Sequence, residues 1–183
     1  IHKNLSGKIV PFAGFEMPLH YGSSLKEHMA VRQAVGLFDI SHMGVIEVSG
    51  PDACQLLEYL STNQIHKKEK HVAIYTVWAK EDGGCIDDLL VYCEDETHFF
   101  VVVNAINREK SLNHLKQYAK GFQVHIQDRY LDFGILALQG PNALALISPL
   151  FLEAKHLKKM HFTPVHYHGQ KLILSRTGYT GEL

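Results

Sequence analysis

Two adjacent carboxylates offer the clearest chemistry in the sequence. Asp87 and Asp88 follow the turn residues Gly83-Gly84 and begin an apolar run that is expected to form a strand over 85–93. Successive side chains of a strand point to opposite faces, which argues against a paired acid–base mechanism at one site. The alternation predicts two sets: Ile86, Asp88, Leu90 and Tyr92 on one face, and Asp87, Leu89 and Val91 on the other. In a different interpretation, both carboxylates accept hydrogen bonds from backbone N–H groups of the turn.

A histidine beside an aspartate and a serine is a second candidate. His42 lies close in sequence to Asp39 and Ser41, which are the residue types of a catalytic triad. A triad needs convergence in space and not adjacency in sequence, so we favour a core or capping role for His42. Met43 could be a flexible apolar contact for a planar ligand or an ordinary core residue.

Two further groups lie near the C-terminal end. His166 and His168 share one face of a predicted strand, with His161 before them, so these rings could bind a metal ion or lie on a surface hairpin. Glu182 ends a glycine-rich turn, 175–182 (SRTGYTGE), and could pair in a bidentate manner with an amidine-like edge such as that of a pterin. Neither GxGxxG nor GxxxxGK[ST] occurs, so a phosphate-binding nucleotide loop has no support.

Composition narrows the class of protein. The chain has 183 residues, of which 46% are hydrophobic, as expected of a folded protein. Lys and Arg number 18 against 19 Asp and Glu, so the basic excess of a non-specific nucleic-acid binder is missing. No apolar run approaches the ~18 residues of a membrane span. Three cysteines without a CxxC pair predict a reducing compartment.

One run of charge stands out, 66–71 (HKKEKH). We interpret it as a solvated loop; the competing interpretation is docking of an acidic partner through Lys67, Lys68 and Lys70.

The secondary-structure pattern predicts an α+β fold with antiparallel sheets. Helices are expected over 24–35, with a capping box at Ser24 and Glu27, over 51–60, from Asn107 to 119, and after Pro141. The expected strands are 44–49, 72–79, 85–93, 98–104, 122–127, 134–138, 163–168 and 171–175. Strands joined by hairpins and interrupted by helices are typical of this class.

Seven ordered motifs resemble the T-protein family of the glycine cleavage system, the aminomethyltransferases. They are 10–18 (VPFAGFEMP), 28–32 (HMAVR), 36–44 (GLFDISHMG), 82–89 (DGGCIDDL), 103–105 (VNA), 137–141 (ALQGP) and 177–182 (TGYTGE). The resemblance covers essentially the whole chain. It implies transfer of a one-carbon unit from the aminomethyl-lipoyl arm of H-protein to tetrahydrofolate, with release of ammonia. Tetrahydrofolate would be a co-substrate and no metal would be required.

The resemblance also assigns site residues. Asp88 would be the catalytic residue, orienting the folate nitrogens N5 and N10 and stabilising positive charge on an iminium-like intermediate. The folate-binding residues would be Met43 as an apolar wall, Tyr75, Asn104 as a polar contact and Glu182 at the amino-pyrimidinone edge. The partner would be lipoylated H-protein, with no nucleic acid or membrane involved. The location would be the cytoplasm in a bacterium or the mitochondrial matrix in a eukaryote.

By the same resemblance, 1–43 and 131–183 would form an incomplete discontinuous folate-binding domain, and 44–130 an inserted α+β domain. Members of the family continue beyond the GYTGE motif, so we expect a fragment or a truncated, inactive product. Two related kinds of protein also fit a folate-binding fold: a folate-binding module of the iron–sulfur maintenance type, and a folate domain from a dimethylglycine or sarcosine dehydrogenase. The first would have a Cys-containing motif and the second an upstream flavin domain; neither is apparent in the 183 residues.

Overall fold

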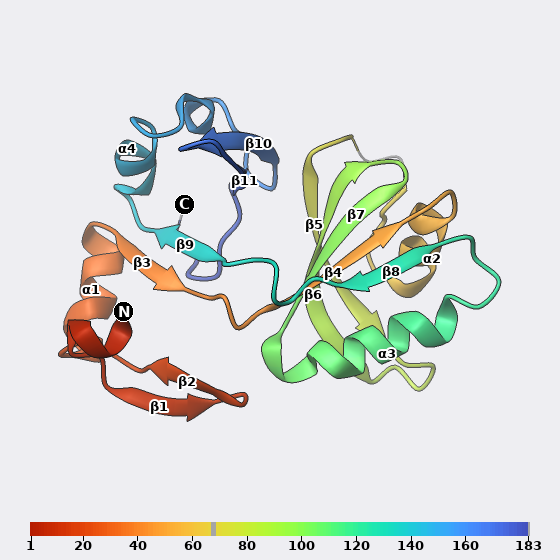
Figure 1. The fold of residues 1–183 in the computed structure, drawn as a ribbon, viewed down its shortest axis with the longest axis horizontal. Coiled ribbons are helices and arrows are strands. Elements are labelled where there is room, and N and C mark those ends of the chain that lie inside the picture. Colours follow the sequence, from red (N-terminus) through yellow and green to blue (C-terminus); the bar gives the residue numbers. More distant parts are fainter. Residues whose placement is uncertain (67–68, 183) are drawn as a thin grey trace.

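A five-stranded antiparallel sheet is the largest element of the computed structural model, which describes residues 1–66 and 69–182 (Figure 1). Its strands, in spatial order, are β5 (Val72–Ala79), β6 (Cys85–Asp95), β7 (His98–Val103), β4 (Gly44–Ser49) and β8 (His125–Asp128). Two helices, α2 (Ala53–Leu60) and α3 (Arg108–Tyr118), contribute side chains to the core on one face of this sheet. The other face is left for the C-terminal part of the chain.

The hydrophobic core lies between the sheet and these two helices. One side of α2 packs against the sheet, because Ala53, Leu56, Leu57 and Leu60 are all buried. Val48 in β4 and Leu115 in α3 are also completely buried in the same cluster. Alternation in the strands supplies apolar side chains to this face, and burying them stabilises the sheet.

A bulge in β6 changes one predicted orientation. Trp78 pairs with Asp87, but the next residue of β5, Ala79, pairs with Cys85, so Ile86 is the extra residue. A bulge interrupts strict alternation. Ile86 therefore joins the core with Leu89, and the prediction that it shares the face of Asp88 is wrong.

The remaining elements form smaller units beside the large sheet (Figure 1). Three two-stranded antiparallel sheets are present in the described residues: β1 (Ile9–Phe12) with β2 (Phe15–Pro18), β3 (Gly36–Asp39) with β9 (Leu136–Gln139), and β10 (Phe162–Tyr167) with β11 (Gln170–Ser175). The helices here are α1 (Ser24–Gln33) and α4 (Ala143–Ile147), with short 3-10 turns at His2–Leu5, Ala105–Asn107 and Leu152–Lys155.

Several predicted boundaries shift for local reasons. Strands β1, β2 and β3 are absent from the predicted set. No element was predicted before residue 24, and Gly36, interpreted as the stop of the preceding helix, instead begins β3. Helix α1 is capped by Ser23, whose hydroxyl accepts from Lys26 N, so the predicted cap at Ser24 is wrong by one residue.

Two more boundaries differ from the prediction. Strand β8 begins at His125, later than expected, because Gly121 has a positive φ and a turn occupies the residues after it. Asn107 stands at the predicted cap of α3 but makes no capping hydrogen bond with its side chain.

Two segments of the chain, one after β3 and one before β9, connect the large sheet to the smaller units. Hydrogen bonds join these two segments to each other. Ile135 N donates to the hydroxyl of Ser41 at 3.0 Å, and Ile40 N donates to Ile135 O at 2.9 Å. The crossing therefore continues the pairing of β3 with β9 toward that of β4 with β8.

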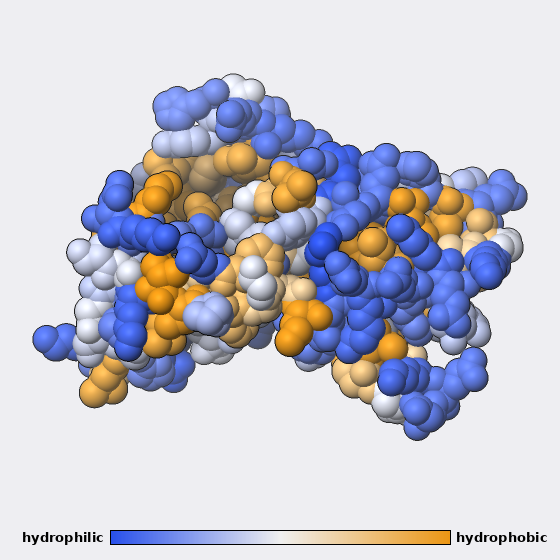
Figure 2. Space-filling view, turned by 60° about the horizontal axis from the view of Figure 1, so that its bottom comes forward, coloured by the Kyte–Doolittle hydropathy of each residue, from blue (hydrophilic) through white to orange (hydrophobic). Residues whose placement is uncertain are grey.

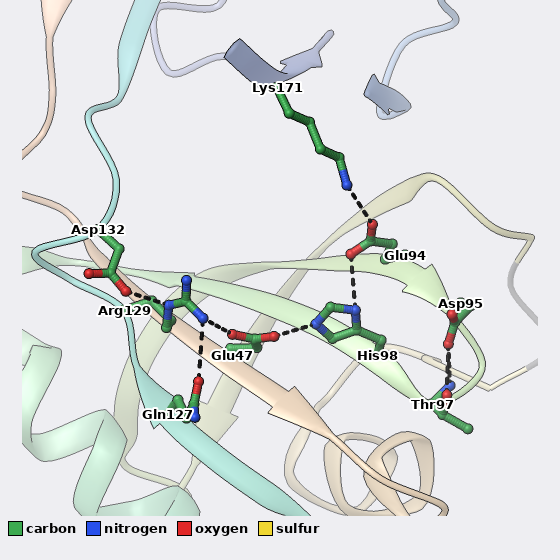
Figure 3. A network of polar contacts seen from close by, with 9 residues as sticks. All are labelled: Glu47, Glu94, Asp95, Thr97, His98, Gln127, Arg129, Asp132 and Lys171. Carbon is green, nitrogen blue, oxygen red and sulfur yellow. Dashed lines mark hydrogen bonds and ion pairs between the residues drawn. The ribbon is translucent and has the colours of Figure 1, made fainter. Parts of the chain in front are cut away.

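A polar network adds a second connection (Figure 3). Glu47 in β4 pairs with both His98 and Arg129, at 2.6 and 2.7 Å. His98 in turn contacts Glu94 at 3.0 Å, and Glu94 lies 3.8 Å from Lys171 of β11. The network thus runs from the edge of the sheet to the C-terminal hairpin.

The α+β class with antiparallel sheets is confirmed. No helix in the described part of the chain is long and apolar enough to cross a membrane.

Candidate functional site

A cavity of about 240 Å³ lies between the open face of the large sheet and the C-terminal segment. The sheet side of its lining contains Met43, Tyr75, Asp88, Leu89, Leu90, Val102 and Asn104. The opposite side contains Met160, Thr177, Gly178 and Tyr179. Four of the five predicted site residues therefore meet at one place, although they are up to 61 positions apart in the sequence.

Asp88 is exposed at the polar end of this cavity. Tyr75 donates its hydroxyl to Asp88 Oδ2 at 3.0 Å, and Asn104 Nδ2 donates to Asp88 Oδ1 at 3.2 Å. The hydrogen bond to Asp88 and the negative charge of its carboxylate raise the pKa of Tyr75. The phenol is therefore held as a donor, and it keeps the Asp88 carboxylate in one orientation.

Asp87 points the other way and is almost fully buried, with 1% of its surface exposed. Its carboxylate accepts from the backbone N–H and the side chain of Asn104, both at 2.9 Å, and from Asn107 Nδ2 at 2.6 Å. These bonds fasten the end of β7 to β6. The prediction that the two aspartates face opposite sides of the strand is confirmed. The Asp87 carboxylate accepts its hydrogen bonds from residues after β7 and not from the glycine turn.

Asn104 has its side-chain nitrogen committed to the two aspartates. Besides the bonds above, Nδ2 donates to the backbone oxygen of Asp88 at 2.9 Å. A ligand in the cavity can therefore use only the side-chain oxygen of Asn104, which is an acceptor.

The C-terminal wall contains part of the glycine-rich turn that the sequence analysis singled out for Glu182, but the lining residues Thr177, Gly178 and Tyr179 were not predicted. Thr177 Oγ1 lies 3.0 Å from both Tyr92 Oη and Ser175 Oγ, so three hydroxyl groups join this wall to the sheet. Loss of solvent, together with the charges of Tyr92 and Asp88, raises the pKa of Tyr179 to about 12. Tyr179 therefore offers a neutral phenol near Asp88.

Met160 has a positive φ of 59°, which is unusual for a residue with a side chain. Two backbone hydrogen bonds hold it, from Ala73 N to Met160 O at 2.8 Å and from Met160 N to Arg176 O at 3.0 Å. A positive φ has no single-residue signal in sequence outside Gly and Asn, which explains why sequence reasoning misses Met160.

A buried glutamine holds the wall in place. Gln139, at the end of β9, is 4% exposed; its Oε1 accepts from the Thr180 hydroxyl at 3.0 Å and its Nε2 donates to Thr177 O at 3.4 Å. A Cβ on Gly178 would lie 2.2 Å from Gln139 Oε1, so only glycine fits beside this amide. The sequence motifs contain both residues but give no sign that they meet.

Glu182 is not among the residues that line the cavity. It forms an ion pair with Arg32 of α1 at 2.6 Å, and its backbone N–H donates to Thr180 Oγ1 at 3.3 Å. In this arrangement, Glu182 fastens the glycine-rich turn to α1. Its predicted contact with a pterin stays a prediction.

The histidine candidates do not form catalytic arrangements in the described residues. Asp39 accepts from Ser41 N and His2 Nε2, and His42 packs edge-on against the rings of Phe12 and Phe15. Burial lowers the pKa of His42, opposed in part by Asp39. His42 is therefore a packing residue and not part of a triad.

The metal interpretation gains no support. In residues 1–66 and 69–182, no group of three or more His, Cys, Asp or Glu side chains is arranged to hold a metal ion. His161 Nδ1 instead lies 2.9 Å from the backbone oxygen of Lys159. Lys67 and Lys68, from the predicted docking loop, lie outside the described residues.

Comparisons with known proteins agree with this geometry. The chain matches the GCVT N-terminal domain family over residues 1–183, and it belongs to that family. It is 44% identical over 183 residues to an aminomethyltransferase from Chloroherpeton thalassium and 42% identical over 186 residues to one from Halothermothrix orenii. Each alignment covers 100% of this chain and 51% of the relative, so the chain spans about half the length of these curated relatives.

A solved structure gives the same result. The crystal structure of the glycine cleavage system aminomethyltransferase T from Bartonella henselae superimposes with a TM-score of 0.87 at 33% sequence identity. The superposition covers 99% of this chain and 49% of that protein. The resemblance inferred from the motifs is thereby confirmed at the level of family and fold.

Proposed function

We propose that this chain forms the folate-binding half of an aminomethyltransferase of the glycine cleavage system. The observation that carries the proposal is the environment of Asp88. One oriented carboxylate stands at the polar end of a cavity whose other walls include Met43, Leu90, Val102 and Met160. Such a combination suits a flat heterocycle with nitrogen atoms along one edge.

The size of the cavity supports binding of one end of tetrahydrofolate. Pockets that enclose a whole drug-sized ligand have volumes of about 300 to 1,000 Å³. At about 240 Å³, this cavity accommodates the pterin end and leaves the glutamyl tail outside. Met43 would contact the ring face, and Asn104 would accept a hydrogen bond from the ring.

The reaction would exchange two bonds at one carbon. The carbon–sulfur bond of the aminomethyl-lipoyl group and its carbon–nitrogen bond break, while bonds from that carbon to N5 and N10 of tetrahydrofolate form. The two folate N–H protons go to the lipoyl sulfur and to the departing ammonia. Asp88, held by Tyr75, would stabilise the positive charge on the folate nitrogens during transfer and orient them.

The finer assignments belong to this proposal. The donor would be lipoylated H-protein, and Glu182 would reach the pterin edge only by leaving Arg32. Residues 44–130 would form the inserted domain, which the continuity of the five-stranded sheet supports, while 1–43 and 131–183 would form the discontinuous one. Three free cysteines and bacterial relatives support a bacterial cytoplasm.

The test is Asp88→Asn in the full-length protein that contains this chain. We expect kcat to fall by about a hundredfold or more, because the neutral amide removes the charge that stabilises the transition state. Asp82→Asn, at an exposed aspartate of the neighbouring turn, is the matched control and should retain activity. Wild-type turnover in Asp88→Asn would refute the catalytic role, and absence of saturable tetrahydrofolate binding to the wild-type protein would refute the proposed function.

A further inference from the structure

Two segments that carry lysine and histidine, about 90 positions apart in the sequence, lie side by side in the fold. The first is 69–71 (EKH), directly before β5, and the second is 155–161 (KHLKKMH). Phe162 N donates to His71 O at 2.9 Å and Ala73 N donates to Met160 O at 2.8 Å. These backbone bonds continue from β5 into the second segment and fix the two runs next to each other.

The second segment lies in the most basic part of the chain. Between Ala154 and Gly181 there are five cationic residues and no Asp or Glu, although the whole chain has a formal net charge of -1. The five are Lys155, Lys158, Lys159, Lys171 and Arg176. The remaining residues contain 13 Lys and Arg against 19 Asp and Glu, so positive charge is concentrated in this stretch of the chain.

The lysines nearest to the junction are available to a partner. We define the basic rim as Lys70, Lys155, Lys158 and Lys159, all of which are exposed. Within the described part of the chain, none of the four forms an ion pair, whereas Lys171 lies 3.8 Å from Glu94. Arg176 Nη1 donates to Leu157 O at 2.9 Å and holds the second segment in place.

The basic rim borders the cavity. Met160, which follows Lys159 directly, lines the cavity, and so does Thr177, which follows Arg176. A macromolecule held by the basic rim would therefore lie beside the cavity, where a flexible arm could enter. A long nucleic acid would need an extended basic track, which a chain of net charge -1 does not provide, so an acidic protein surface fits better.

We infer that the basic rim is the docking site for an acidic face of the protein that carries the aminomethyl group. This inference rests on the proposed function, because it concerns how the donor reaches the Asp88 cavity. Surface charges of this kind mainly raise the rate of association, and their effect weakens with salt.

The experiment compares two triple variants of the full-length protein in steady-state assays with aminomethylated H-protein. The test variant is Lys155→Glu, Lys158→Glu and Lys159→Glu. The control is Lys110→Glu, Lys116→Glu and Lys120→Glu, at exposed lysines in or next to α3, on the sheet face opposite to the cavity. We expect KM for the carrier to rise about tenfold or more in the test variant only, with kcat and the KM for tetrahydrofolate unchanged.

Salt provides the second readout. The difference in carrier KM between wild type and the test variant should shrink at about 0.5 M salt, because screening weakens the attraction that the wild type has and the variant lacks. A carrier KM equal to that of the wild type, or an equal rise in the control, would overturn the inference. If the wild-type protein shows no transfer from H-protein at all, the proposed function fails instead.

A single substitution tests whether Lys70, from the first segment, contributes to docking together with the lysines of the second segment. Lys70→Glu should raise the carrier KM in the same direction, about threefold, because Lys70 belongs to the same rim despite its distance in the sequence. No change in Lys70→Glu would limit docking to 155–159 and refute the two-segment rim. Thermal unfolding of each variant identifies any loss of folding.

Discussion

At the scale of single residues, Asp87 and Asp88 have opposite surroundings. Asp87 lies on the helix side of the sheet, 1% exposed, and its carboxylate accepts hydrogen bonds from the two asparagines after β7, Asn104 and Asn107. Asp88 lies on the cavity side, exposed, and contacts Tyr75 and Asn104. The same side chain therefore has a structural role at one position and is available for chemistry at the next.

This difference predicts that the same substitution lowers stability strongly at Asp87 and hardly at all at Asp88. Asp87→Asn should lower the free energy of unfolding by about 2 kcal/mol, because an amide group replaces an acceptor that faces three N–H donors in a buried site. Asp88→Asn should change it by no more than about 0.5 kcal/mol, as is usual at exposed positions. Urea unfolding of both variants measures this, and equal stability losses would contradict the assignment.

At the scale of elements, the glycine-rich turn after β11 is positioned by residues from three other segments. Gln139 of β9 bonds to Thr177 and Thr180, Arg32 of α1 pairs with Glu182, and Tyr92 of β6 bonds to Thr177. Bonds on both sides of the turn determine how far this wall stands from the Asp88 wall. The width of the cavity therefore depends on packing outside it.

A methyl group at Gly178 should widen or distort this site. In Gly178→Ala the new Cβ would meet the Gln139 amide at 2.2 Å, and the amide cannot move freely because it is buried and hydrogen-bonded. We expect tetrahydrofolate affinity to fall about tenfold and stability to fall by about 1–3 kcal/mol. Calorimetric titration of the full-length protein measures the first effect.

The control for this prediction is Gly22→Ala. A Cβ added to Gly22 would meet no atom within 4 Å, and the residue has no positive φ, so alanine there should leave folate affinity unchanged. Equal affinity in Gly178→Ala and wild type would show that the turn does not set the cavity width.

At the scale of the whole molecule, hydrophobic residues gather on the surface of the smaller units. Figure 2 shows these residues on the part of the surface formed by β1, β2, α1 and β3, which are labelled in Figure 1. The exposed side chains there include Phe12, Leu25, Leu37 and Phe38, with Leu136 of β9 beside them. Their exposure contrasts with the closed core of the large sheet, so most of the buried apolar surface lies in 44–130.

Two half-buried histidines, His42 and His114, give the whole molecule a pH dependence. Burial lowers the pKa of His42 and of His114 below the usual value of 6.5. The unfolded chain therefore binds protons more readily than the folded one as pH falls through about 6.5, and stability decreases in that range. Neutral imidazoles at higher pH carry no such penalty.

The measurement is urea unfolding between pH 7.5 and pH 5. We expect the midpoint to decrease with pH in the wild-type protein, and the double substitution His42→Phe and His114→Phe to flatten this part of the curve. Phenylalanine suits both sites, because His42 packs on Phe12 and His114 on Trp78. A decrease of the same size in the double variant would assign the effect to other groups.

The sequence alone determined the family, the α+β class, most strands of the large sheet and the prediction that Asp87 and Asp88 face opposite sides of their strand. These follow from local patterns, because alternation fixes which face a strand residue occupies and a motif keeps its spacing along the chain. The tertiary structure decided which distant segments meet: Met160 and Tyr179 at the cavity, Gln139 with Thr177 and Thr180 in its wall, Arg32 with Glu182, and 69–71 with 155–161 at its rim. Such contacts depend on chain crossings, a bulge and a positive φ, which no local pattern specifies.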